Sequence, residues 1–264
     1  MFVVAIAELR TPLEIEAAAL AADHKTTVYE ERLNLTAGLP AVVLTTPDID
    51  LARAALGRLR ARGHGAIAVD SGVVIASSDM IEARRFRLEE RTLAAGDPAD
   101  SHLPWDDLLA ILRATHRSQT ATETERKQKE FSLGRALATG GLIVSKTTTH
   151  TSSSVRPFQV QVVYLFRKSG ETPWILRETG THWGALNLTT IQSSMQSFVT
   201  TVGRLRERAP GAVYDERLMM VRKVPERLAL AASGNAKSVT VSSESGIDLL
   251  AHLVAAWIDA ARKK

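Results

Sequence analysis

The chain has 264 residues, of which 45% are hydrophobic and 23% charged, so it is long enough for one large domain or two smaller ones with a buried core. It contains no cysteine, which excludes disulfides, thiolate nucleophiles and cysteine-ligated metal sites. Basic residues outnumber acidic ones by only 33 to 29, and a formal charge of +4 spread this evenly does not indicate a dedicated nucleic-acid binder.

The beginning of the chain shows neither a basic leader nor a membrane-spanning run. The apolar part of "MFVVAIAELR" is too short for the hydrophobic region of a signal peptide followed by a cleavage site. No run in the chain approaches the roughly 18 apolar residues of a membrane span. We therefore predict a cytoplasmic protein. The heavy use of Arg and Ala, with little Lys, is typical of a GC-rich bacterial genome.

Helix-start signals alternate with short apolar runs in the first part of the chain. Thr11 with Glu14, and Thr27 with Glu30, have the spacing of capping boxes, and a third start signal follows the second apolar run. β-branched runs flank these helices and predict strands. The predicted order is a strand at 1–8, helices at 12–24 and 27–37, a strand at 41–46, a helix at 47–62 and a strand at 65–70.

This β-α-α-β-α-β order in residues 1–72 resembles two related bacterial modules. One is the C-terminal domain of the ribosomal stalk protein, to which the stretch from "TTVYEERLNL" to "GAIAVD" is similar. The other is the N-degron adaptor of the Clp protease, whose helix start is similar to "TPLE" at 11–14. Both families bind other proteins and catalyse nothing, so the resemblance implies a protein-binding module.

The functional residues of these families carry over poorly. The adaptor grips an N-terminal amine with an Asn and acidic residues before its Thr-Pro, where this chain has Glu8 and Arg10, and Arg10 would repel an ammonium group. The stalk domain contacts translation factors through basic residues on its early helices, where this chain offers Glu14. We therefore predict a contact surface near Glu8, Arg10 and Leu13 for a different protein partner.

Residues 73–104 are predicted to connect this domain to a larger one. "RRFRLEE" at 84–90 has the pattern of an edge strand, and "AAGDPADSHLP" at 94–104 that of a loop. Residues 105–264 are predicted to form a larger antiparallel α+β domain with a C-terminal helix. The whole chain is therefore expected to belong to the α+β class.

The larger domain has both helical and strand patterns. "WDDLLAILRATHRS" at 105–118 carries apolar residues at helical spacing and predicts a helix. The Ser/Thr-rich stretch at 147–154 predicts a hairpin tip or loop. The last helix is expected to begin near Ser245, with Asp248 as the partner in a capping box. The strands are predicted at 131–146, 157–168 and 172–183.

Two nucleotide-binding patterns are incomplete, so we predict no cofactor. "GGLIVSKT" at 140–147 has Ser145 where the second Gly of a phosphate-binding loop belongs, and a strand is the better interpretation. Arg87 and Arg91, with the downstream "EFSLGR", outline a cyclic-dinucleotide site of the PilZ type. That site needs Gly where this chain has Arg135.

Candidate catalytic groups are few. The seven histidines show no metal-ligand spacing, so we predict no metal site. His182, followed by Trp183 between two glycines, is either part of a hydrolase site or the neighbour of a Trp that covers a hydrophobic core. "YDERL" at 214–218 either supplies a carboxylate to a site or forms a salt-bridged surface turn.

The sequence therefore supports three hypotheses about function. The first is a non-catalytic protein-binding or adaptor protein. The second is a hydrolase-type enzyme with its site around His182. The third is a nucleic-acid binder that uses Arg84, Arg85 and Arg87, although these arginines stand among glutamates and also fit a self-neutralising solvated edge.

Overall fold

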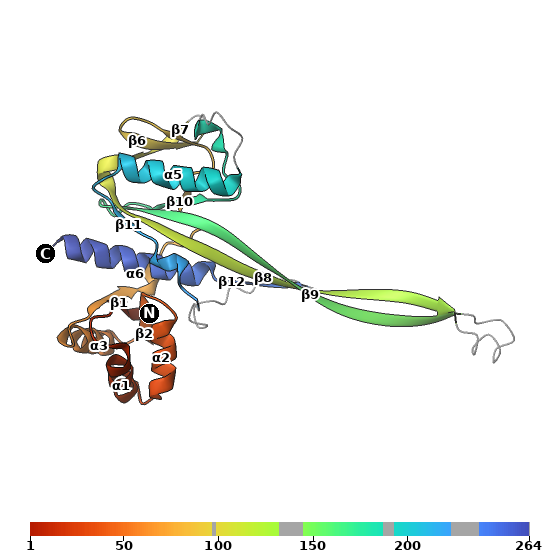
Figure 1. Cartoon of the computed structure of the whole chain (residues 1–264), viewed down its shortest axis with the longest axis horizontal. Coiled ribbons are helices and arrows are strands. Elements are labelled where there is room, and N and C mark those ends of the chain that lie inside the picture. Colours follow the sequence, from red (N-terminus) through yellow and green to blue (C-terminus); the bar gives the residue numbers. More distant parts are fainter. Residues whose placement is uncertain (97–98, 132–144, 187–192, 223–237, 264) are drawn as a thin grey trace.

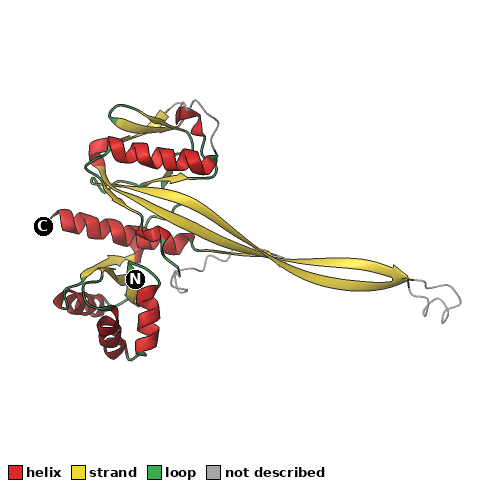
Figure 2. Ribbon diagram, viewed as in Figure 1, coloured by secondary structure: helices red, strands yellow, loops and turns green. Residues whose placement is uncertain are grey.

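The structure is a computed structural model in which helices and sheets alternate in layers and a long two-stranded arm projects from the body (Figures 1 and 2). Its helices and mixed sheets make the chain an α+β protein, as predicted. The structure describes residues 1–96, 99–131, 145–186, 193–222 and 238–263.

The N-terminal unit is an antiparallel sheet in the order β2-β1-β3, with helices on one face. Side chains alternate along β1, so Val4 and Ile6 pack under the helices while Val3 and Ala5 lie on the opposite face. The predicted β-α-α-β-α-β order is confirmed. The elements are β1 (Phe2–Glu8), α1 (Leu13–His24), α2 (Val28–Thr36), β2 (Ala41–Thr46), α3 (Ile49–Ala61) and β3 (Gly65–Asp70).

One of the two predicted capping boxes is present. At the start of α2, Thr27 Oγ1 accepts the Glu30 N–H at 3.2 Å, and the Glu30 carboxylate accepts the Thr27 N–H at 2.9 Å. The predicted box at Thr11 is wrong, because α1 begins without a side-chain cap and Thr11 Oγ1 lies 3.3 Å from His64 Nε2. The Thr11 hydroxyl, which the local pattern predicted to cap the helix, instead contacts His64, a residue distant in the sequence.

The larger unit is built on a sheet in the order β11-β8-β9-β10-β4, with β12 pairing β8 farther along the same strand. Its long central pairs are antiparallel, and the short edge strands β4 and β11 pair in parallel. The strands are β4 (Ile81–Glu82), β8 (Leu108–Phe131), β9 (Ser145–Arg167), β10 (Trp174–Arg177), β11 (Val213–Asp215) and β12 (Ser238–Ser242).

Residues 73–104, predicted as a connector, contribute strands to two sheets. β4 joins the large sheet, and a smaller sheet in the order β5-β6-β7 follows. The edge strand predicted at 84–90 corresponds to β5, whereas the loop predicted at 94–104 is wrong because β6 and β7 pair across it. The elements are β5 (Phe86–Leu88), β6 (Thr92–Gly96), β7 (Ala99–Pro104) and the short 3₁₀ turns η1 (Ser71–Val73), η2 (Trp105–Asp107), η3 (Trp183–Leu186) and η4 (Arg217–Met219).

The helix predicted at 105–118 is wrong, because Leu108 begins the long strand β8. The first part of this strand, in the body of the molecule, is buried on both faces. Leu108 and Ile111 pack toward α5 (Ser194–Arg208), while Leu109 and Leu112 pack toward α6 (Glu244–Arg262). A strand covered on both sides reads as a continuous apolar run, and such a run has no period that separates it from a buried helix.

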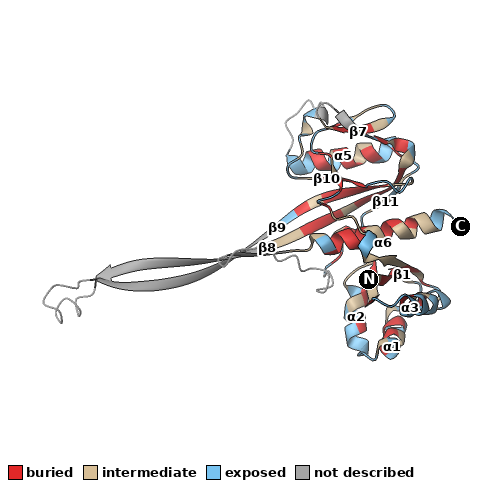
Figure 3. Ribbon diagram, turned by 180° about the vertical axis from the view of Figure 1, so that it is seen from behind, coloured by how far each residue is buried: buried red, intermediate tan, exposed pale blue. Residues whose placement is uncertain are grey.

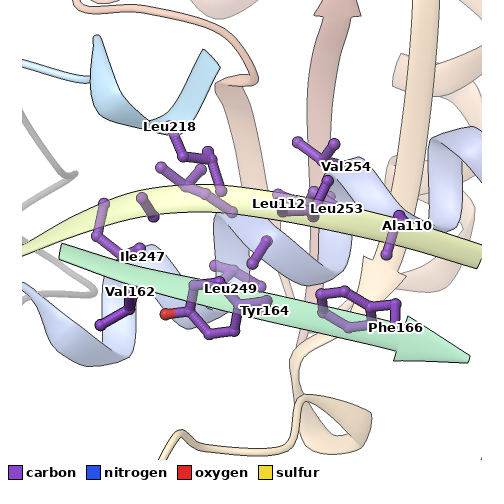
Figure 4. Close-up of a cluster of buried hydrophobic side chains, with 14 of the residues drawn as sticks. Ala110, Leu112, Val162, Tyr164, Phe166, Leu218, Ile247, Leu249, Leu253 and Val254 are labelled. Atoms are coloured by element: carbon purple, nitrogen blue, oxygen red, sulfur yellow. The ribbon is translucent and has the colours of Figure 1, made fainter. Parts of the chain in front are cut away.

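Helix α6 lies between the N-terminal sheet and the large sheet and is buried over most of its length (Figures 1 and 3). Its apolar residues form one hydrophobic cluster with residues of β1, β3, β8 and β9. Figure 4 shows part of this cluster, in which β8, β9 and α6 contribute most of the side chains. The N-terminal unit therefore shares a core with the rest of the chain.

Strands β8 and β9 pair from Leu108 opposite Arg167 to Phe131 opposite Ser145, with one shift of register between Leu108 and Ala110. Near the body, other strands flank them. Beyond Thr122, where the pairing with β12 ends, the described strands pair only with each other and form the projecting arm (Figure 1). The loop predicted at 147–154 is wrong, since these residues lie within β9 and Thr favours the extended backbone. Most of the strand predicted at 131–146 lies outside the described residues.

Candidate protein-binding groove

A surface groove of about 590 Å³ lies between the N-terminal unit and β11, the edge strand of the large sheet. One wall is the end of β1 with the residues that follow it, and the other is the segment 214–217. Both units are needed to form it. The lining residues are Ala7, Glu8, Leu9, Leu39, Tyr214, Asp215, Glu216 and Arg217.

Arg217 joins the two walls of the groove. Its Nη1 donates to the backbone oxygen of Ala7 at 2.6 Å, and its Nε donates to Asp215 Oδ2 at 2.7 Å. Its guanidinium also lies 5.0 Å from the centre of the Trp257 ring on α6. The Asp215 pair is the salt-bridged turn that the pattern at 214–218 suggested. Arg217 therefore connects both walls of the groove to each other and to α6.

Accessible carboxylates give the groove an acidic character. Glu8 Oε2 accepts a hydrogen bond from Arg10 Nη2 at 3.0 Å, and this bond and the charge of Arg10 lower the pKa of Glu8. The Glu216 side chain is 61% exposed, accepts the Tyr214 hydroxyl at 3.0 Å and lies 3.9 Å from Arg113 Nη1. Both carboxylates can therefore meet a cation that enters the groove.

Of the three residues predicted to form a contact surface, Glu8, Arg10 and Leu13, the structure brings only the first two to the groove. Glu8 lines the groove, and Arg10 is held at its edge by Glu8. Leu13 instead packs against the hydrophobic cluster beneath the N-terminal helices. The opposite wall, around Tyr214, was assigned no part in this surface because it is distant in sequence.

In the described part of the chain, no catalytic group lies in hydrogen-bond contact with the His182 ring of the hydrolase hypothesis. His182 is exposed, and its backbone N–H donates to the Arg84 oxygen at 2.7 Å. Trp183 packs edge-on against Phe86 and Phe198, with ring centres 6.1 and 6.4 Å apart. Trp183 thus covers the hydrophobic core, as in the second interpretation that the sequence allowed for His182 and Trp183.

The arginines of the nucleic-acid hypothesis lie on and before β5. Arg84 Nε is 2.8 Å from Glu82 Oε2, and Arg87 Nε is 3.7 Å from Glu89 Oε1. Arg85 is exposed. Since two of the three arginines each face a carboxylate two residues away, the segment has the charge arrangement of a self-neutralising edge.

A second set of polar groups is buried between α6 and the large sheet. Asp248, on α6, accepts hydrogen bonds from the Ser77 N–H at 2.8 Å, from the Ser77 hydroxyl and from the Tyr164 hydroxyl at 2.6 Å. The capping box predicted for Asp248 is wrong, because α6 begins at Glu244 and this carboxylate points into the core instead. Sequence reasoning missed the set. The signal that could have revealed these buried groups is Asp248 itself, a single carboxylate within the apolar face of a predicted helix.

His116 extends this buried set toward the surface. Its Nε2 lies 2.6 Å from the Tyr164 hydroxyl, whose only proton goes to Asp248, so Nε2 is the donor of this bond. The other ring nitrogen then accepts from Arg177 Nη1 at 3.4 Å, and Arg177 Nη2 also bonds Glu244 at 2.6 Å. This chain of bonds requires a neutral imidazole.

These groups resemble the members of a catalytic triad in type but not in arrangement. A serine nucleophile must give its proton to a histidine. Here the Ser77 hydroxyl bonds Asp248, and Tyr164 stands between that carboxylate and His116. All four side chains are buried. The set is therefore a structural network that joins α6 to β8 and β9.

We expect acid to destabilise the fold through His116. Burial, the largest cause, and the charge of Arg177 lower the pKa of His116 from its ordinary value of 6.5. The stability that depends on neutral His116 is thus complete above pH 6.5 and decreases as the pH falls below it, by at most about 1.4 kcal/mol per pH unit. Burial lowers the pKa of His252 as well, which adds a loss in the same direction.

Urea unfolding at pH 7.5 and 5.5 measures this loss. The His116→Gln variant should be less stable than the original protein at pH 7.5 but should lose less stability on acidification, because only His252 remains of the pair. An equal loss in both proteins would show that His116 is not the group that responds.

Among the described residues, no helix is long and apolar enough to cross a membrane, and no group of three or more His, Asp or Glu side chains is arranged to hold a metal ion. Comparisons with protein-family models, with curated proteins and with solved structures found no match to this chain.

Proposed function

We propose that the protein is a non-catalytic binding or adaptor protein that captures a positively charged segment of another protein in the groove between β1 and β11. The observation that carries this proposal is the groove itself, which is walled by two units and presents Glu8 and Glu216 to solvent. Leu9, Leu39 and Tyr214 also line the groove and add apolar surface beside these charges. A Lys or Arg with an apolar neighbour fits this combination.

Arg10 is the intramolecular competitor of such a ligand. Its ion pair with Glu8 is exposed on both sides, and pairs of this kind contribute little to stability, so an incoming cation can replace Arg10 at low cost. We therefore expect Arg10→Glu to increase affinity for a basic segment. We expect the double variant Glu8→Ala/Glu216→Ala to decrease it about tenfold or more.

The experiment screens a phage-displayed dodecapeptide library against the full chain. The enriched peptides are then synthesised, and their affinity for the protein is measured. The full chain is used because the N-terminal unit shares its core with α6. The matched control is Glu14→Ala/Asp50→Ala, which removes two exposed carboxylates from the N-terminal helices. The proposal is wrong if no basic peptide is enriched, or if the control weakens binding as much as the groove variant.

A shortened chain separates the groove from the arm. Glu123 and Ser153 are paired directly, so residues 124–152 can be replaced by an Asn-Gly turn that suits a two-residue hairpin. This variant keeps every residue of the groove. It should bind the enriched peptides as the full chain does, whereas loss of binding in a folded variant would assign the site to the arm.

A further inference from the structure

A second hollow adjoins the groove at Tyr214. It has a volume of about 490 Å³ and lies at the end of α5. Apart from Arg206 and Glu207 its lining is small or apolar, and Tyr214 belongs to both hollows. Its lining residues are Gly203, Arg206, Glu207, Ala209, Pro210, Ala212 and Tyr214.

Tyr214 is the middle residue of β11, and its side chain contacts two charged groups. The Arg206 guanidinium lies 4.2 Å from the ring centre, and the hydroxyl donates to Glu216. β11 pairs with β8 along one edge, and in the described part of the chain no strand pairs with its other edge. An open strand edge thus runs between the two hollows.

We infer that the captured segment lies extended beside β11 and adds a strand to the large sheet. This inference rests on the proposed function and specifies how the segment is bound. Backbone hydrogen bonds to β11 supply part of the affinity, while the two hollows select side chains. A Lys or Arg enters the groove with Glu8 and Glu216, and a small apolar side chain enters the hollow beside Gly203.

The length of β11 sets the spacing of these two side chains. A strand advances about 3.3 Å per residue, and the hollows lie on either side of the central residue of β11, so the selected residues should be about two to four positions apart. The two hollows lie on opposite faces of the large sheet, one at the end of α5 and the other beside the N-terminal unit, and side chains alternate between the faces of a strand, which favours an odd separation such as three positions. The enriched peptides should therefore share a basic and an apolar residue at one fixed spacing.

Backbone N-methylation of an enriched dodecapeptide tests strand addition. In a strand, alternate N–H groups point to the same neighbour, so methylating one alternate set should lower affinity tenfold or more and methylating the other set should change it little. If both sets weaken binding equally, or neither does, while binding still depends on Glu8 and Glu216, strand addition is wrong and the proposed function stands. If the unmethylated peptide binds independently of both carboxylates, both proposals fail.

Gly203→Leu tests the second hollow independently. A Cβ at Gly203 would meet no atom beyond its own helix backbone within 4 Å, so there is room for a side chain that extends into the hollow, and the substitution replaces a helical glycine by a better helix former. Gly57→Leu on α3 is the matched control, since that position is equally open. We expect Gly203→Leu, but not Gly57→Leu, to lower the affinity for the dodecapeptide at least fivefold. It should also remove the protein's preference for an apolar residue in the peptide. Equal affinities of the two variants would contradict a role of this hollow.

Discussion

Replacing Asp248 by alanine is expected to lower the free energy of unfolding by about 3–5 kcal/mol. The Asp248 carboxylate is 2% exposed and accepts three hydrogen bonds, from the N–H and the hydroxyl of Ser77 and from the Tyr164 hydroxyl. Its removal leaves these donors buried without an acceptor. The bonds also connect α6 to β9 and to the segment before β4, so their loss loosens the packing of the central helix.

Asp259→Ala is the matched control, because it removes a carboxylate of the same helix that pairs with the nearby Arg262 and Lys263. Such a pair near the surface contributes at most about 1 kcal/mol. Chemical denaturation of both variants at pH 7.5 gives the comparison. If Asp248→Ala is no less stable than Asp259→Ala, the buried network does not stabilise the fold.

Glu16→Ala is expected to lower the free energy of unfolding by about 2–4 kcal/mol. The Glu16 side chain is fully buried on α1 and bonds the guanidinium of Arg62 at 2.8 Å and His64 Nε2 at 2.7 Å. The backbone N–H of Arg10 donates to His64 Nδ1, so Nε2 carries the proton that Glu16 accepts. Alanine at this position leaves a buried N–H and a half-buried cation with fewer acceptors.

Glu14→Ala tests whether this loss depends on burial. Glu14 lies two residues earlier on α1, is 62% exposed and pairs with Arg32. Its removal should change stability by less than about 1 kcal/mol. Thermal unfolding with far-UV circular dichroism compares the two variants. Similar melting temperatures for both would mean that the Glu16 bonds only balance the cost of burying these charges.

The two buried networks also bear on the proposed function. The network of Glu16 orients the segment after β1, since His64 contacts both the Arg10 backbone and Thr11. That segment begins with Leu9 and directly follows Glu8, and both of these residues line the groove. Destabilising substitutions in the N-terminal unit are therefore poor probes of binding, and the exposed carboxylates Glu8 and Glu216 are better ones.

Local signals in the sequence predicted the N-terminal unit well because its elements are short and bounded by turn residues. The capping box at Thr27 and the glycine after α3, Gly63, which has a positive φ, each depend on a few adjacent residues. The same reasoning failed at β8. There the pattern depends on burial of both faces by α5 and α6, and both of these lie far away in the chain.

Of the two walls of the candidate groove, only the one at the end of β1 contains residues that the sequence predicted to form a contact surface. Glu8 and Arg10 were singled out because they stand where the adaptor that residues 1–72 resemble has its amine-binding residues. The pattern at 214–218 was recognised as charged, yet nothing in the sequence brings the two together. Their contact, made by Arg217 and the Ala7 oxygen, spans more than two hundred residues. Asp248 was likewise placed in a local helix cap, because its hydrogen-bond donors, Ser77 and Tyr164, come from distant segments.

By itself, the sequence determined the α+β class, the order of the first six elements and the polar character of the residues near Glu8, since these follow from local backbone preferences and from composition. The tertiary structure alone decided that α6 is buried between two sheets, that Asp248 accepts bonds in the core and that a groove exists beside β11. The physical reason is that burial and hydrogen-bond partners depend on which distant segments pack together, and no local pattern contains that information.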